Sequence, residues 1–372
     1  MSDTDTNEAT VPHAFSDDDA IDLLKNAVSI PSLSGQEQNV AEYLVGEMGR
    51  FADEAFVDGA GNAVARLGSG DLKVTFLGHI DTVPGVVPVR REDDTLFGRG
   101  VVDAKGAFCT AVAAASRLEP SLFDHLTLTL IGAVEEESPT SKGARHALQA
   151  YPKPDMLVIG EPSGWDALTL GYKGRLVLKL SLQKDNFHSA GDDTTAAEDM
   201  VAVWQRISSW AERASVDATG IFDRVQVALQ EIHSESDGLT QHASATIGFR
   251  LPPDYPPDSV EAAVREQLTD LPVTGLSLTF SGHEQPHKAP KDTALSRAFR
   301  VAIRQQGGTP RFKLKTGTAD MNVVAPFWDV PMLAYGPGDS SFDHRPDEQL
   351  PLADYRRAIA VLHAALSRLA HP

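Results

Sequence analysis

The sequence predicts an α/β fold in which a mixed sheet flanked by helices carries an inserted α+β domain. Apolar runs of strand length alternate with amphipathic runs of helix length along most of the chain. Three of the apolar runs end in polar residues, around His79, Glu135 and Glu161. A central stretch, 174–285, instead combines alternating strands with two helical patterns. This change of pattern indicates a second domain inside the first.

The expected elements follow in chain order. A first helix starts at about Ala20, and the first domain then has strands over 72–77, 126–134 and 156–159 and a helix over 105–118. The inserted part has strands over 175–182, 225–232, 243–251 and 276–280, with helices over 195–214 and 259–271. The chain returns to a helix over 293–306, a strand over 332–335 and a last helix over 352–369. We therefore expect a catalytic domain of residues 1–173 and 286–372 and a lid or dimerisation domain of residues 174–285.

Composition narrows the class of protein. The chain has 372 residues, of which 42% are hydrophobic, enough for two domains with real cores. It holds 52 acidic and 33 basic side chains, a formal net charge of -19, which argues against nucleic acid as a partner and favours a salt-adapted protein. We expect a cytoplasmic location, because we find neither a long apolar run nor a secretory signal. The single cysteine, Cys109, excludes an intrachain disulfide and a cysteine-based metal site.

Polar residues cluster at strand ends, where open α/β sheets build their sites. Each cluster has an ordinary interpretation: an acidic triplet is usually a solvated surface, and Gly98-Arg99-Gly100 lacks the rest of a dinucleotide-binding motif. Together, however, they supply one His, one Asp, two Glu and a second His. Such a set can bind divalent metals and leave one carboxylate as a base. The clusters are 78–84, 98–106, 135–137, 160–163 and 343–348.

The order of these motifs resembles the M20 metallopeptidase family over almost the whole chain. The motifs are His79-x-Asp81, Gly100-x-x-Asp103-x-Lys105-Gly106, Glu135-Glu136, Glu161 and His344. The family includes acetylornithine deacetylase, succinyl-diaminopimelate desuccinylase and related carboxypeptidases. The resemblance implies an amide hydrolase with two divalent metal ions per subunit, zinc or cobalt.

Roles at the metal site are implied by the same resemblance. Asp81 would orient a histidine ligand, and Glu135 would be the general base. Glu137 is a departure, because relatives often have glycine there. The implied ligand set shares one carboxylate between two metals: His79 and Glu161 on one, Glu136 and His344 on the other, and Asp103 between them.

Roles in substrate binding are implied for residues of the inserted domain and nearby loops. In a homodimer, His188 would reach the partner's active site and stabilise the oxyanion. Arg250 would bind the substrate carboxylate. The remaining candidates are Thr318 and Asn322 in a loop that lines the pocket, and Lys173 and Arg175 in a basic rim at its mouth.

Two stretches resemble one branch of the family: residues 133–137 with 141–145, and residues 160–166 with 170–175. Enzymes of that branch release lysine or ornithine from the C-terminal glutamate of LysW, a small acidic amino-group carrier protein, in lysine and arginine biosynthesis. Acetylornithine deacetylase and succinyl-diaminopimelate desuccinylase remain alternatives with the same metal chemistry. A non-catalytic metal-binding scaffold is an alternative of another class. The presence of Glu135 argues against it, because a scaffold does not need a general base.

Overall fold

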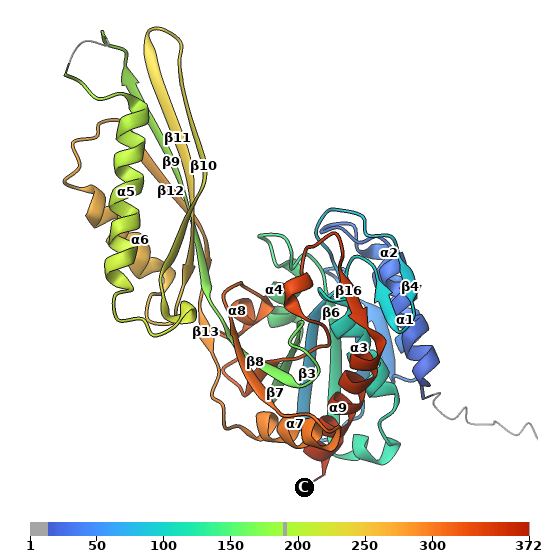
Figure 1. Ribbon diagram of the computed structural model, residues 1–372. Helices are drawn as coiled ribbons and strands as arrows, with labels where there is room; N and C mark the ends of the chain where they lie inside the picture. The colour runs from blue at the N-terminus through green and yellow to red at the C-terminus, as the bar shows by residue number, and fades with distance from the viewer. Residues whose placement is uncertain (1–13, 189–191, 372) are drawn as a thin grey trace, which may run out of the picture. The chain divides into compact units, whose positions relative to one another are not determined.

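A computed structural model describes residues 14–188 and 192–371. The chain forms two compact units (Figure 1). The first holds the residues before Gly171, together with Ala289–Lys313 and the residues after Pro326; the second holds Gly171–Lys288 and Leu314–Pro326. The contacts thus group 314–326 with the inserted part, whereas the expected division into catalytic and lid domains stays a prediction about function.

A mixed sheet forms the centre of the first unit. Its parallel strands β3, β6 and β7 are neighbours, and the antiparallel strands β1 and β2 extend one edge. In sheet order the strands are β1 (Glu54–Val57), β2 (Ala63–Leu67), β6 (Leu126–Ala133), β3 (Leu72–His79), β7 (Met156–Gly160), β15 (Met332–Ala334) and β8 (Ala167–Tyr172). The central strands are mostly buried because helices cover them.

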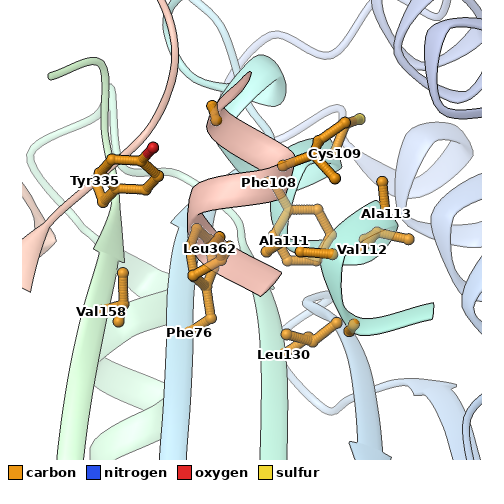
Figure 2. Close-up of a cluster of buried hydrophobic side chains, with 14 of the residues drawn as sticks. Phe76, Phe108, Cys109, Ala111, Val112, Ala113, Leu130, Val158, Tyr335 and Leu362 are labelled. Atoms are coloured by element: carbon orange, nitrogen blue, oxygen red, sulfur yellow. The ribbon is translucent and has the colours of Figure 1, made fainter. Parts of the chain in front are cut away.

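Six helices surround this sheet. They are α1 (Asp17–Ser29), α2 (Gln38–Met48), α3 (Lys105–Ser116), α4 (Lys142–Ala150), α7 (Ala294–Gln305) and α9 (Leu352–Ala370). Figure 2 shows the core between them, where Phe76, Leu130 and Val158 of three neighbouring strands meet Phe108 of α3 and Leu362 of α9. Each of these side chains is at most 2% exposed, so each contributes about 1.5–3 kcal/mol through burial. This core holds the strand ends in fixed positions.

A small three-stranded sheet lies in the first unit, in the order β16 (Gln349–Pro351), β5 (Thr95–Phe97) and β4 (Arg90–Glu92). The pairing of Leu350 with Leu96 brings two segments together that lie far apart in the sequence. One segment contains His344, and the other leads into the loop that contains Asp103. This sheet therefore links two of the predicted site residues.

The second unit has an antiparallel sheet with helices on one face (Figure 1). Leu176, Leu178, Leu180 and Leu182 alternate with polar residues along one strand and are buried with the helices in a separate core. Its sheet order is β10 (Gln226–Ser236), β11 (Thr240–Leu251), β9 (Gly174–Asp185) and β12 (Leu276–Glu284), with helices α5 (Ala196–Ala214), α6 (Pro257–Leu268) and α8 (Asp320–Val324). Two short strands, β13 (His287–Lys288) and β14 (Arg311–Lys315), pair with β8.

The fold class expected from the sequence is confirmed. The predicted central strands and long helices are present, with ends shifted by a few residues. The elements that the sequence did not predict are mostly short or weakly patterned: β1, β2, β4, β5, β8, β13, β14, β16, α2, α4 and α8. None of the described helices combines the length and hydrophobicity that a membrane-spanning segment requires.

Candidate active site

Three neighbouring parallel strands deliver their polar residues to one edge of the sheet. His79 is the last residue of β3 and pairs with Ala133 at the end of β6. Gly78 pairs with Gly160 at the end of β7, so Glu161 also emerges at this edge. The glutamate triplet 135–137 follows β6 directly. Parallel pairing therefore gathers these side chains, as the sequence predicted.

Asp103 lies between the two predicted histidine ligands. Its Oδ1 is 3.1 Å from Nε2 of His79, and its Oδ2 is 3.1 Å from Nε2 of His344. Glu161 contributes an oxygen 3.8 Å from the same nitrogen of His79. One carboxylate thus presents one oxygen to each histidine, which is the arrangement that a bridging ligand requires.

The ring of His79 is held with Nδ1 as a hydrogen-bond donor. Its Nδ1 lies 3.0 Å from the main-chain oxygen of Asp81 and 3.4 Å from Oδ1 of the same residue. Carbonyl and carboxylate oxygens accept hydrogen bonds, so Nδ1 is the nitrogen that donates. Nε2 is then the nitrogen that faces Asp103 and is available to a metal.

The glutamate triplet is arranged differently from the expectation. Glu137, which was not in the expected ligand set, pairs with His344: Oε1 of Glu137 lies 2.9 Å from Nε2. The atoms of His79, Asp103 and Glu137 lie close enough to hold one ion. Glu135, the expected base, instead accepts a hydrogen bond from Thr140 at 2.6 Å and lies 3.6 Å from Nζ of Lys142.

The backbone explains this arrangement. Glu135 adopts a left-handed conformation with φ 59°, which turns the chain at the end of β6. The carboxylate of Asp81 then accepts hydrogen bonds from the amides of Glu136 and Glu137, at 3.1 and 3.0 Å. Asp81 therefore anchors both His79 and the two glutamates that follow the turn.

Glu37 contributes to this turn, although no motif in the sequence points to it. The residue is 5% exposed, and its carboxylate accepts hydrogen bonds from the amides of Glu135 and Gly35. Burial raises the pKa of Glu37, although these hydrogen bonds oppose the shift. Glu37 lies in an ordinary polar stretch before α2, so only the fold shows its contact with the triplet.

The carboxylates around His79 and His344 raise the pKa of both histidines. Burial disfavours charged His79, but hydrogen bonds with Asp103 and Asp81 outweigh burial and raise its pKa well above the ordinary value. Hydrogen bonds with Asp103 and Glu137 raise the pKa of His344 to about 10. At neutral pH and without metal, both rings are therefore positively charged, with a proton on each nitrogen, and a metal ion would displace the proton on Nε2.

The metal-free protein is expected to lose stability as pH rises from about 6.5 to about 10. Both pKa values are higher in the folded chain than in the unfolded chain, so the folded state binds more protons in this window. Stability from these pairs is fully present below the unfolded pKa and is lost as pH passes through the folded pKa. Thermal unfolding midpoints in chelator should fall across this range, and the fall should be smaller in His344→Gln. An identical pH dependence in both proteins would contradict the assignment.

The remaining predicted residues belong to the second unit. Nη1 of Arg250 donates to Oγ1 of Thr318 at 3.2 Å, and burial together with the charge of Arg175 lowers the pKa of Arg250. Asn322 is buried, and its side-chain amide donates to the main-chain oxygens of Lys173 and Gln285. Asn322 therefore holds segments of this unit together.

His188 and Lys173 differ sharply in exposure. The side chain of His188 is exposed, whereas that of Lys173 is completely buried. Nζ of Lys173 donates to the main-chain oxygen of Arg224 and to Oε1 of Gln226. The expectation that Lys173 forms part of an exposed basic rim is therefore wrong, because its ammonium group makes hydrogen bonds within the second unit.

Comparisons with known proteins find relatives over most of the chain. The sequence profile of peptidase family M20/M25/M40 matches residues 75–368. A LysW-lysine hydrolase from Deinococcus radiodurans is 57% identical over 354 residues, which cover 94% of this chain and 97% of that protein. A LysW-lysine/LysW-ornithine hydrolase from Thermococcus kodakarensis is 37% identical over 95% of this chain and 93% of that protein.

A solved structure supports the same conclusion for the fold. An M20 family metallo-carboxypeptidase from Sulfolobus solfataricus superposes with a TM-score of 0.76 at 17% identity, over 94% of this chain and 98% of the other. The profile spans most of this chain, and the relatives named above are hydrolases. The expected class of enzyme, a metal-dependent amide hydrolase, is thus confirmed, and the chain belongs to the peptidase family M20/M25/M40.

Proposed function

We propose that this enzyme releases lysine or ornithine from the C-terminal glutamate of the carrier protein LysW, in lysine or arginine biosynthesis. The observation that carries the proposal is the 57% identity with a LysW-lysine hydrolase across nearly the full length of both chains. Acetylornithine deacetylase and succinyl-diaminopimelate desuccinylase activities are the alternatives, because they need the same metal chemistry.

The residues at the sheet edge fit two divalent metal ions. Two imidazoles and three carboxylates converge, and one carboxylate lies between the imidazoles. Such nitrogen and oxygen donors suit zinc or cobalt. We propose His79 and Glu161 for one ion, Glu137 and His344 for the other, and Asp103 for both. When bound, such ions polarise the scissile carbonyl and lower the pKa of water.

Glu136 is our candidate for the general base. Its charge helps to raise the pKa of His79, which indicates that Glu136 lies near the ligand cluster. Both neighbours in the triplet have contacts that favour other roles: Glu135 contacts Thr140 and Lys142, and Glu137 contacts His344. Glu136 would take a proton from the attacking water and deliver it to the leaving amine.

The test is hydrolysis of defined substrates by the purified enzyme in high salt. LysW charged with lysine or with ornithine should be cleaved, and acetylornithine and succinyl-diaminopimelate should be cleaved much more slowly. Dialysis against a chelator should abolish turnover, and zinc or cobalt should restore it. Preference for a small substrate over both charged carriers would replace the proposal with one of the alternatives. Full activity in exhaustively metal-free protein would overturn the two-metal assignment.

His188 allows a test of the proposed homodimer. If His188 acts in the partner's site, His188→Ala and Glu136→Gln should each be almost inactive, yet mixed dimers should contain one complete site. After random subunit exchange, activity should recover to about a quarter of the wild-type value, because about half of the dimers are mixed and one site of two is complete. Mixed dimers without activity would place His188 in its own subunit's site, and an active His188→Ala enzyme would place it outside catalysis.

A further inference from the structure

Glu348 is a buried carboxylate that contacts neither predicted histidine ligand but binds the loop that contains Asp103. Glu348 is completely buried and follows His344 by four residues. Its Oε1 accepts three hydrogen bonds from main-chain amides, those of Gly100, Val102 and Asp103, at 3.0, 2.9 and 3.2 Å. Its Oε2 lies 2.8 Å from Nη1 of Arg99. The carboxylate thus binds the loop 99–103 over almost its whole length.

These contacts hold a buried loop through a single carboxylate. Hydrogen bonds to an ionised acceptor are roughly twice as strong as neutral ones. A buried carboxylate is tolerated only when it is paired and hydrogen-bonded, and all of these partners come from the single loop that ends at Asp103. The loop is therefore fixed with respect to Glu348.

Glu348 also belongs to the segment that carries His344. The main-chain oxygen of Glu348 accepts from the amide of Gly98 at 3.3 Å, and the next residues form β16, which pairs with β5. Main-chain and side-chain contacts of one residue thus join the segment of His344 to the loop of Asp103. The distance between His344 and Asp103 therefore depends on the contacts of Glu348.

We propose that Glu348 is a positioning residue that keeps Asp103 turned with one oxygen towards each histidine. It binds no metal itself and acts through the amide of Asp103. The proposal rests on the proposed two-metal function. Its consequence is measurable without turnover: loss of the carboxylate should weaken metal binding.

Glu348→Gln tests this with little change of volume. Glutamine has one oxygen, which can accept from the three amides or face Arg99 but cannot do both, and it has no charge. We expect zinc affinity, measured by competition with a chromogenic chelator, to fall about 10- to 100-fold, the usual effect of losing an outer partner of a metal ligand. In the metal-free protein, the amides of Gly100, Val102 and Asp103 should exchange hydrogen faster than in the wild type.

Asp199→Asn is the matched control. Asp199 is a carboxylate in the second unit, 5% exposed, and it pairs with Lys184 at 2.8 Å. This variant should lower stability while zinc affinity and exchange in residues 99–103 stay at wild-type values. If Glu348→Gln does not fold, Arg99→Gln removes the partner of the other oxygen and should weaken zinc binding in the same direction.

Zinc affinity within twofold of the wild type in a folded Glu348→Gln or Arg99→Gln variant would overturn the positioning role. Failure of the wild-type protein itself to bind zinc or cobalt would instead overturn the proposed function. The two failures are therefore distinguishable in one set of titrations.

Discussion

Replacing Glu136 with glutamine should lower kcat by about 10²- to 10⁴-fold while both metals stay bound. The substitution keeps the shape of the side chain and removes only its capacity to accept a proton, and general acid–base catalysis contributes about this factor. The proposed ligands are unchanged in this variant, so metal content measured by elemental analysis should equal that of the wild type.

The two neighbouring glutamates provide internal controls, because each is placed differently. Glu137→Gln should lower metal occupancy, since Glu137 pairs with His344 at the site. Glu135→Gln should retain most activity, since its carboxylate contacts Thr140 and Lys142. A Glu135→Gln enzyme that is inactive but fully metal-loaded would restore the assignment expected from the sequence, with Glu135 as base and Glu136 as ligand.

Asp103→Asn should reduce activity by at least about 10³-fold and lower the content of both metals. The amide keeps one oxygen, so only one histidine can still face an oxygen acceptor, and the charge that would lie between the two cations is lost. Stoichiometry by elemental analysis, together with chelator competition, checks this prediction.

Asp166→Asn is the appropriate control for that variant. Asp166 forms an ion pair with Arg311 in the same unit but takes no part in the proposed ligand set. Its replacement should leave metal content unchanged and change stability by about 1 kcal/mol or less, as is usual for pairs near the surface. Two bound metals in Asp103→Asn would show that Asp103 does not bridge.

The sequence predicted which strand ends would supply the site, but not which glutamate would face His344. Parallel strands with apolar centres and polar ends are visible in the order of residues, and so His79 and Glu161 could be predicted as neighbours. Three identical side chains in a row give no such signal. Their directions depend on the left-handed turn at Glu135 and on the two amides held by Asp81.

Residues whose contacts lie far apart in the chain were likewise not predictable from the sequence. Lys173 is a charged residue just before a predicted strand, where a surface position is expected. Only the fold shows that it is buried against Arg224 and Gln226. Glu348 lies in the motif that the sequence singled out around His344, yet its partners are about 245 residues away in the chain. Local patterns report periodicity and turns, whereas these contacts are set by the packing of the whole unit.

The grouping of Leu314–Pro326 with the second unit determines how chimaeras of related enzymes must be designed. Asn322 donates to main-chain oxygens of Lys173 and Gln285, near the two ends of the longer segment of that unit. A graft of residues 171–288 alone would meet a foreign 314–326 segment and leave these buried acceptors without a matched donor. Exchange of substrate preference between relatives therefore requires that both segments be transplanted together, with four junctions in place of two.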